Sequence, residues 1–206
     1  MALESQLANA AFEAYIEAPT WKWGDLHARL SLVEGCRVIS FRGTTTDPRD
    51  WVVDLRVDRT LDPQIGMCHS GFLDAARTLL EVIPLGQIAG AVLAGHSLGG
   101  ALAVLIGAKA VMQGCRPSAI VTFGAPRAGS SQLKHILAPL PMRMYRNGND
   151  PVPDVPRAIW PFWGFYAHPR RLLEIGTPRL DPFVAHGVIQ YRESLRAVEE
   201  HLFAGR

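Results

Sequence analysis

The chain has 206 residues, of which 48% are hydrophobic, with 21 Lys and Arg against 19 Asp and Glu. This length predicts a single domain over residues 1–206, with a core that needs neither disulfides nor a metal ion to fold. The formal net charge of +2, without a block of like charges, argues against nucleic-acid binding, and 19 Gly with 15 Pro are too few for a collagen-like or low-complexity chain.

Apolar stretches with helical spacing alternate along the chain with short apolar runs that are typical of strands. In chain order they predict a helix at 3–16, strands at 26–32 and 38–41, a helix at 70–83, a strand at 91–94, a helix at 101–111, a strand at 119–123, a helix at 130–137, strands at 142–146 and 172–175, and a C-terminal helix at 188–202. Buried strands that alternate with helices indicate an α/β fold, with a mostly parallel central sheet and helices on both faces.

Residues 82–108 contain no Asp, Glu, Lys or Arg, so a hydropathy window flags them as a membrane span. Gln87, His96, Ser97 and several glycines interrupt this stretch and would be poorly placed against lipid. We therefore expect a buried strand, a turn and a buried helix there, and no transmembrane segment.

The three cysteines, Cys36, Cys68 and Cys115, are odd in number and lack metal-ligand spacing. The first six residues carry an acid and no basic stretch of the kind that begins a secretory signal. We expect free thiols in a reducing compartment, cytoplasmic by default, and neither a metal nor another cofactor.

Residues 95–99 fit the pattern Gly-x-Ser-x-Gly, which is weak evidence alone but here stands between an apolar strand and an apolar helix. A serine on a sharp strand-to-helix turn needs small neighbours, which Gly95, Gly99 and Gly100 supply. The turn also directs the free N–H groups of the helix N-terminus toward anything bound near Ser97. We expect Ser97 to be a nucleophile, although an ordinary helix cap is the alternative.

A serine nucleophile needs a base, and the base needs an acid that orients it. In this architecture the chain order is serine, acid and then histidine. Asp150 follows the strand at 142–146 within the turn 147–151, at a carboxyl end where ligands gather in an open α/β sheet. We expect Asp150 to be the acid, and its alternative role is that of a turn aspartate bonded to its own backbone.

Three histidines follow Asp150 and are candidates for the base. His201 falls within the amphipathic terminal helix, and His168, beside Pro169, could equally be structural. His186 lies in a loop before that helix, from which it can reach over Ser97, so we favour His186. His69 and His96 precede the acid and are more simply explained as structural.

An oxyanion hole needs two donors, one from the residue after the nucleophile and one from the loop of an earlier strand. The amide of Leu98 is the first. The turn 41–44 ends the first buried strand, and Thr44 can offer its amide and its hydroxyl. A threonine-rich turn without a catalytic role is the alternative.

The chain resembles the class 3 (fungal-type) triacylglycerol lipases, members of the α/β-hydrolase fold, from about Val38 to Tyr191. The segments that carry the resemblance are 41–44 (FRGT), 51–55 (WVVDL), 69–72 (HSGF), 95–102 (GHSLGGAL), 123–127 (FGAPR), 149–153 (NDPVP), and His186 with Tyr191 after it. The resemblance implies Ser97 as nucleophile, Asp150 as acid, His186 as base, and Thr44 and Leu98 as the oxyanion hole. The family also carries a non-catalytic histidine at the place of His168.

The resemblance and the composition suggest roles for two further segments. Residues 45–58 mix apolar and charged side chains, so they could form a lid helix or a fixed surface helix. Residues 160–166 hold five aromatics, which could line an acyl pocket or simply pack on one another in a hairpin turn.

The sequence therefore predicts a serine carboxylic ester hydrolase, a lipase that cleaves triacylglycerol or other hydrophobic esters, with transient contact to a lipid interface. An esterase or phospholipase for short or polar esters is the alternative within the same chemistry. A catalytically silent scaffold is the alternative of another class, which the filled nucleophile, acid and base positions argue against. The sequence leaves acyl length, regioselectivity and oligomeric state open.

Overall fold

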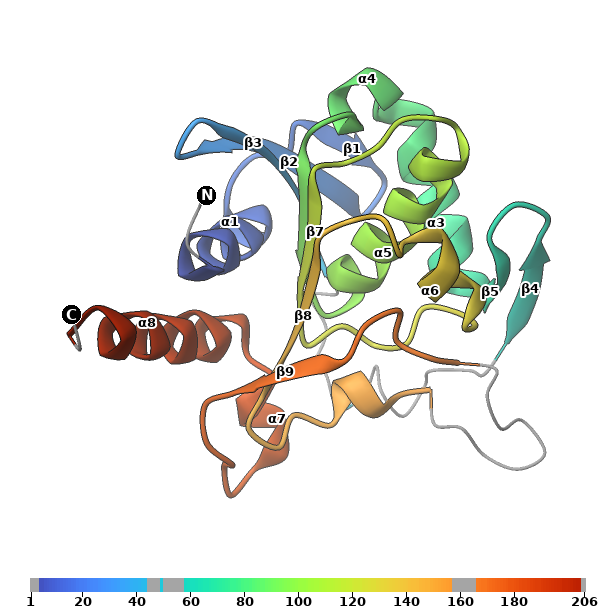
Figure 1. Ribbon diagram of the computed structural model, residues 1–206. Helices are drawn as coiled ribbons and strands as arrows, with labels where there is room; N and C mark the ends of the chain where they lie inside the picture. Colours follow the sequence, from blue (N-terminus) through green and yellow to red (C-terminus); the bar gives the residue numbers. More distant parts are fainter. Residues whose placement is uncertain (1–3, 44–48, 50–57, 157–165, 205–206) are drawn as a thin grey trace.

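A seven-stranded sheet forms the centre of the computed structural model, which describes residues 4–43, 49, 58–156 and 166–204 (Figure 1). The strands lie in the order β1-β2-β3-β6-β7-β8-β9. Their bounds are β1 Trp21–Trp23, β2 Leu26–Val33, β3 Cys36–Phe41, β6 Val92–His96, β7 Ala119–Phe123, β8 Met142–Asn147 and β9 Leu172–Ile175. From β3 to β9 all pairings are parallel, whereas β1, β2 and β3 pair antiparallel at one side. The predicted mostly parallel α/β architecture is confirmed.

Helices cover both faces of this sheet (Figure 1). On one face lie α1 (Glu4–Ile16) and α8 (Val188–Ala204), and on the other α3 (Ser70–Val82), α4 (Leu85–Ile88), α5 (Leu98–Met112) and α6 (Gln132–Ile136). The core accordingly divides into two apolar clusters, one on each side of the sheet. Most of helix α5 lies in the interior, because every residue from Gly99 to Ala108 is buried. A helix that is apolar all round is expected only where protein surrounds it.

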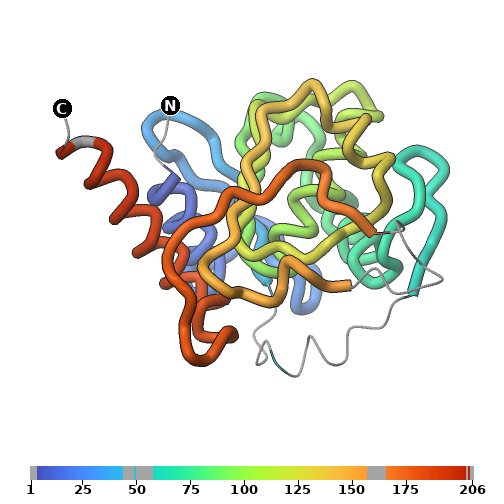
Figure 2. Tube along the Cα trace, turned by 60° about the horizontal axis from the view of Figure 1, so that its bottom comes forward, coloured from blue at the N-terminus to red at the C-terminus, as the bar shows by residue number. Residues whose placement is uncertain are grey.

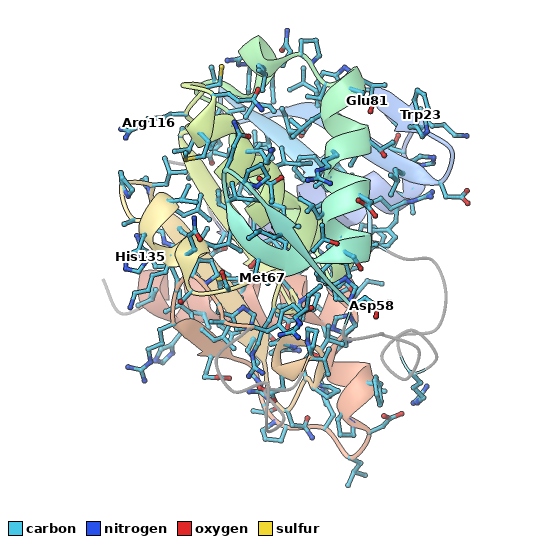
Figure 3. All side chains as sticks on the ribbon, turned by 90° about the vertical axis from the view of Figure 1, so that its right-hand side faces the viewer. Trp23, Asp58, Met67, Glu81, Arg116 and His135 are labelled. Carbon is cyan, nitrogen blue, oxygen red and sulfur yellow. The ribbon has the colours of Figure 1, made fainter. Side chains whose placement is uncertain are left out.

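The chain between β3 and α3 adds a second, two-stranded sheet of β4 (Arg59–Asp62) and β5 (Gly66–His69). Figure 3 looks onto this side, with Met67 of β5 near the centre and Glu81 toward the far end of α3. The carboxylate of Asp62 is fully buried there and accepts hydrogen bonds from Arg77, Lys109 and the amides of Gln64 and Ile65. Of these donors, Arg77 attaches the hairpin to α3 and Lys109 attaches it to α5.

Most predicted elements agree with the structure within a few residues. The sequence prediction missed β1, the β4–β5 hairpin and the short helices α4 and α7 (Pro182–Ala185). Each of these has only three or four residues per element, too few to establish a hydrophobic period. No helix within the described ranges is long and apolar enough to cross a membrane. Besides α4, residues 82–108 hold the strand β6, the turn at Ser97 and most of helix α5, as expected. Cys36, Cys68 and Cys115 are all free thiols.

The Asp62 cluster makes stability depend on pH. Burial works to raise the pKa of Asp62, but hydrogen bonds from the Gln64 amide, Lys109 and Arg77 outweigh it and hold the pKa at about 2. Because this value is depressed below the unfolded one, the stabilisation is complete above pH ~4 and is lost as the pH falls toward 2.

Replacing Asp62 by Asn should therefore lower the free energy of unfolding by about 1–3 kcal/mol at pH 7, because charged hydrogen bonds are lost. Urea titrations at pH 7 and pH 2.5 measure this, and the difference between wild type and variant should shrink at the lower pH. A difference that stays constant between the two pH values would refute the role assigned to the carboxylate.

Candidate active site

Ser97 occupies the sharp turn between β6 and α5. Its backbone has φ 57° and ψ −129°, and it is one of two non-glycine residues with positive φ among the described residues. A side chain in this region is strained, and such strain persists only where the surroundings enforce it. The Ser97 amide donates to the carbonyl of Phe123 on β7 at 2.9 Å, which holds the turn against the neighbouring strand.

The glycines around Ser97 are required by close backbone contacts. A Cβ on Gly95 would lie 2.2 Å from the backbone of Gly99, and one on Gly99 would lie 2.0 Å from the carbonyl oxygen of Phe41. A Cβ on Gly100 would lie 2.6 Å from the Cβ of Ala125. The small residues expected from the sequence motif are therefore what allows the strand, the turn and the helix to meet.

Asp150 lies just after β8, in the turn that follows the strand. Its side chain is fully buried and accepts three hydrogen bonds. Oδ1 accepts from the Val152 amide at 2.9 Å, while Oδ2 accepts from the Tyr191 hydroxyl at 2.6 Å and from His186 Nδ1 at 2.8 Å. The carboxylate thus has donors on both oxygens without any contact with solvent.

His186 follows α7, and its side chain is 1% exposed. Because the Asp150 carboxylate can only accept, Nδ1 carries the proton and Nε2 is left with a lone pair. This Nε2 is buried and has no hydrogen-bond partner among the described residues. His168 Nδ1 is also buried without a partner, so what distinguishes His186 is that a buried carboxylate orients its ring and leaves Nε2 able to accept a proton.

Residues next to Ser97 in the chain and in the sheet contact His186, although no hydrogen bond joins Ser97 Oγ to His186 Nε2. The His96 ring, one residue before Ser97, lies 4.6 Å from the His186 ring between centroids. Gly124 follows Phe123, whose carbonyl accepts the hydrogen bond from the Ser97 amide. A Cβ on Gly124 would be 3.0 Å from His186 Nδ1 and 2.8 Å from Asp150 Oδ2. The carboxyl ends of these strands face the viewer in Figure 2, where the segments before α8 and after β8 run beside one another.

The surroundings of the candidate histidines show which of them can pair with Asp150. His168 is largely buried, and its Nε2 bonds the carbonyl of Pro153 at 2.7 Å, while burial lowers its pKa. His69 caps α3, where its side chain accepts from the Phe72 amide. His201 is exposed near the end of α8. Of the three histidines downstream of Asp150, only His186 hydrogen-bonds its carboxylate.

Leu98 is the first residue of α5, and the first amides of a helix have no partner within it. Its amide is therefore available as an oxyanion donor. Thr44 lies outside the described residues, as does nearly all of the 45–58 segment and of the aromatic stretch 160–166. Tyr166, at the end of that stretch, is buried and donates to the carbonyl of Asp58 at 2.9 Å.

Tyr191 and Asn147, for which the sequence predicts no role, support Asp150 and His186. The Tyr191 hydroxyl accepts from the Asn147 amide at 3.0 Å in addition to donating to Asp150. The side chain of Asn147 donates to the carbonyl of Ala185 at 2.9 Å, beside His186, and accepts from Ser194. Burial and the Asp150 charge raise the pKa of Tyr191 well above its usual value, so it remains a donor. The described part of the chain contains no cluster of side chains suited to a metal ion.

Comparison with solved structures defines the class of fold. The lipase of Rhizopus microsporus var. chinensis aligns with a TM-score of 0.68 at 21% identity, over 84% of this chain and 71% of that one. The Rhizomucor miehei lipase in its propeptide complex aligns with a TM-score of 0.63 at 22% identity, over 83% of this chain and 65% of that one. The chain has the α/β-hydrolase fold.

The family follows from the sequence itself. The family model "Lipase (class 3)" matches residues 38–160, more than half of the chain, and the chain therefore belongs to the class 3 lipase family. The secreted mono- and diacylglycerol lipase 1 of Fusarium solani is 29% identical over 135 residues, which are 60% of this chain. The match spans only 40% of that relative's length.

The packing around Ser97 predicts a specific sensitivity. Gly99→Ala should lower the free energy of unfolding by at least 1–3 kcal/mol, because the new Cβ would overlap the Phe41 carbonyl and push α5 away from β3. Thermal and urea unfolding measure the loss. The matched control is Gly86→Ala in α4, where nothing lies within 4 Å of the added carbon. Equal stability of the two variants would contradict the packing described.

Proposed function

We propose that the chain is a serine carboxylic ester hydrolase, a lipase that cleaves acylglycerols or other hydrophobic esters through an acyl-enzyme. The observation that carries this proposal is the buried Asp150–His186 pair, whose histidine ring lies 4.6 Å from the ring of His96, the residue before the strained Ser97 turn. Membership of the class 3 lipase family and the name of the Fusarium relative support acylglycerols as the substrate class.

In the proposed mechanism Ser97 attacks the ester carbonyl while His186 Nε2 takes its proton and then protonates the leaving alcohol. Asp150 fixes the tautomer of His186 through Nδ1 and stabilises the imidazolium that forms. The amide of Leu98, together with Thr44, would hold the negative oxygen of the tetrahedral intermediate. Water then hydrolyses the acyl-enzyme, and no step needs a metal or a cofactor.

The proposal includes transient contact with a lipid surface, because the substrate is insoluble. Leu180 is fully exposed and Val184 is half exposed in the segment that leads to His186, on the same edge of the sheet. Such side chains can enter an interface without loss of internal packing.

Labelling with a serine-directed fluorophosphonate tests the nucleophile. We expect a single adduct, mapped by mass spectrometry to Ser97 and absent from Ser97→Ala. Ser40→Ala is the matched control, since Ser40 is also a buried serine and should not affect labelling. An adduct on another residue would overturn the assignment, and equal ester turnover by wild type and Ser97→Ala would favour a silent scaffold.

Asp150→Asn tests the acid. An amide side chain can donate to Nδ1 as well as accept from it, and it carries no charge, so it no longer enforces the tautomer with the proton on Nδ1, and kcat should fall about 10⁴-fold. Steady-state hydrolysis of a soluble aryl ester measures it, with circular dichroism to verify folding. A fall of less than about ten-fold in a folded variant is incompatible with the role given to Asp150.

The dependence of the hydrolysis rate on acyl length distinguishes a lipase from a short-chain esterase. Rates on aryl esters from C2 to C16 should rise toward long chains and increase further on emulsified acylglycerol. A maximum at short chains, with no gain on emulsions, would replace the lipase by an esterase or phospholipase for polar esters.

A further inference from the structure

A second histidine, His96, lies against the proposed base without touching the proposed acid. It is 6% exposed, and its Nε2 lies 2.6 Å from the backbone carbonyl of His186. Its Nδ1 lies 3.0 Å from the hydroxyl of Tyr15, which belongs to α1. One imidazole therefore joins the N-terminal helix to the backbone of the loop that carries His186.

The direction of both hydrogen bonds follows from their partners. The His186 carbonyl can only accept, so His96 Nε2 carries the proton and Nδ1 accepts from the Tyr15 hydroxyl. Burial, with the nearby His186, lowers the pKa of His96 to about 3, so this ring is neutral under ordinary conditions. A neutral ring adds no charge to oppose the imidazolium that forms on His186 in the proposed reaction.

Tyr15 extends the connection to the strand that leads to the oxyanion turn. Burial raises the pKa of Tyr15, although the backbone of Gly43 hydrogen-bonds its oxygen and lowers it. A Cβ at Gly43 would lie 2.2 Å from the Tyr15 hydroxyl and 2.8 Å from the His96 carbonyl, so only glycine fits there. Gly43 directly precedes Thr44, the second oxyanion donor expected from the sequence.

We propose that Tyr15 and His96 are positioning residues for the reaction proposed above: a continuous hydrogen-bond chain from Gly43 through both side chains to the His186 carbonyl sets the base relative to the oxyanion turn. Asp150 fixes the His186 ring, and this chain fixes the His186 backbone. Neither residue touches substrate, so both act through His186 and Gly43.

Tyr15→Phe tests the chain without changing the packing volume. We expect kcat to fall about ten-fold, the kinetic equivalent of one hydrogen bond, with KM changed less than two-fold. The matched control is Tyr145→Phe, which removes a hydroxyl from a buried tyrosine on β8 that plays no part in the chain. It should keep wild-type kcat. Equal kcat for the two variants would overturn the proposal.

Two substitutions of His96, one that keeps a hydrogen-bond donor and one that removes it, test the contact with the His186 carbonyl. His96→Gln keeps an N–H that can reach the His186 carbonyl and should retain most of kcat, whereas His96→Leu should lose at least ten-fold. Equal losses in both variants would contradict positioning by that donor and would indicate a packing role.

Amide hydrogen exchange gives a readout that does not depend on catalysis. In Tyr15→Phe and His96→Leu, the amides of residues 183–188 should exchange at least ten-fold faster than in wild type, at an unchanged unfolding midpoint. Unchanged exchange would overturn the proposed positioning by Tyr15 and His96. This outcome can be read whether or not the chain hydrolyses esters. Failure of Ser97 to label with fluorophosphonate, with exchange altered as expected, would instead refute the proposed function alone.

Discussion

The hydrogen bond between His186 Nδ1 and Asp150 Oδ2 is the interaction on which the proposed chemistry depends. Both side chains are almost completely buried, so the bond forms in a medium where an unsatisfied charge would be costly. Tyr191 and the Val152 amide supply the remaining donors to the carboxylate. With Nδ1 committed to Asp150, the only open position on the ring is Nε2.

The parallel sheet explains why residues so far apart in sequence can meet. β6, β7 and β8 run side by side, so the turns that follow β6 and β8 lie at one edge, and the loop that carries His186 is bonded to the same edge through Asn147 and His96. The glycines at 95, 99 and 100 permit the strained turn that places Ser97, itself buried, at that edge. Fold and site are therefore set by the same contacts.

The strands and long helices could be predicted because their hydrophobic periods extend over enough residues. Asp150 and His186 could be predicted from chain order and from the motif at Ser97. The support given by Tyr191, Asn147 and His96 could not, because each bonds a backbone group or a carboxylate distant in sequence, and no periodicity records such a partner. The β4–β5 hairpin escaped prediction for a related reason, since it depends on Asp62 meeting Arg77 and Lys109 from two helices.

The most direct measurement is a crystal structure of the protein after reaction with a phosphonate ester. The account predicts phosphorus bonded to Ser97 Oγ, His186 Nε2 within about 3.2 Å of that oxygen or of the leaving-group oxygen, and the phosphoryl oxygen accepting from the Leu98 amide. A Ser97 adduct in which the His186 ring points away from Ser97 and no longer bonds Asp150 would contradict the role of the Asp150–His186 pair.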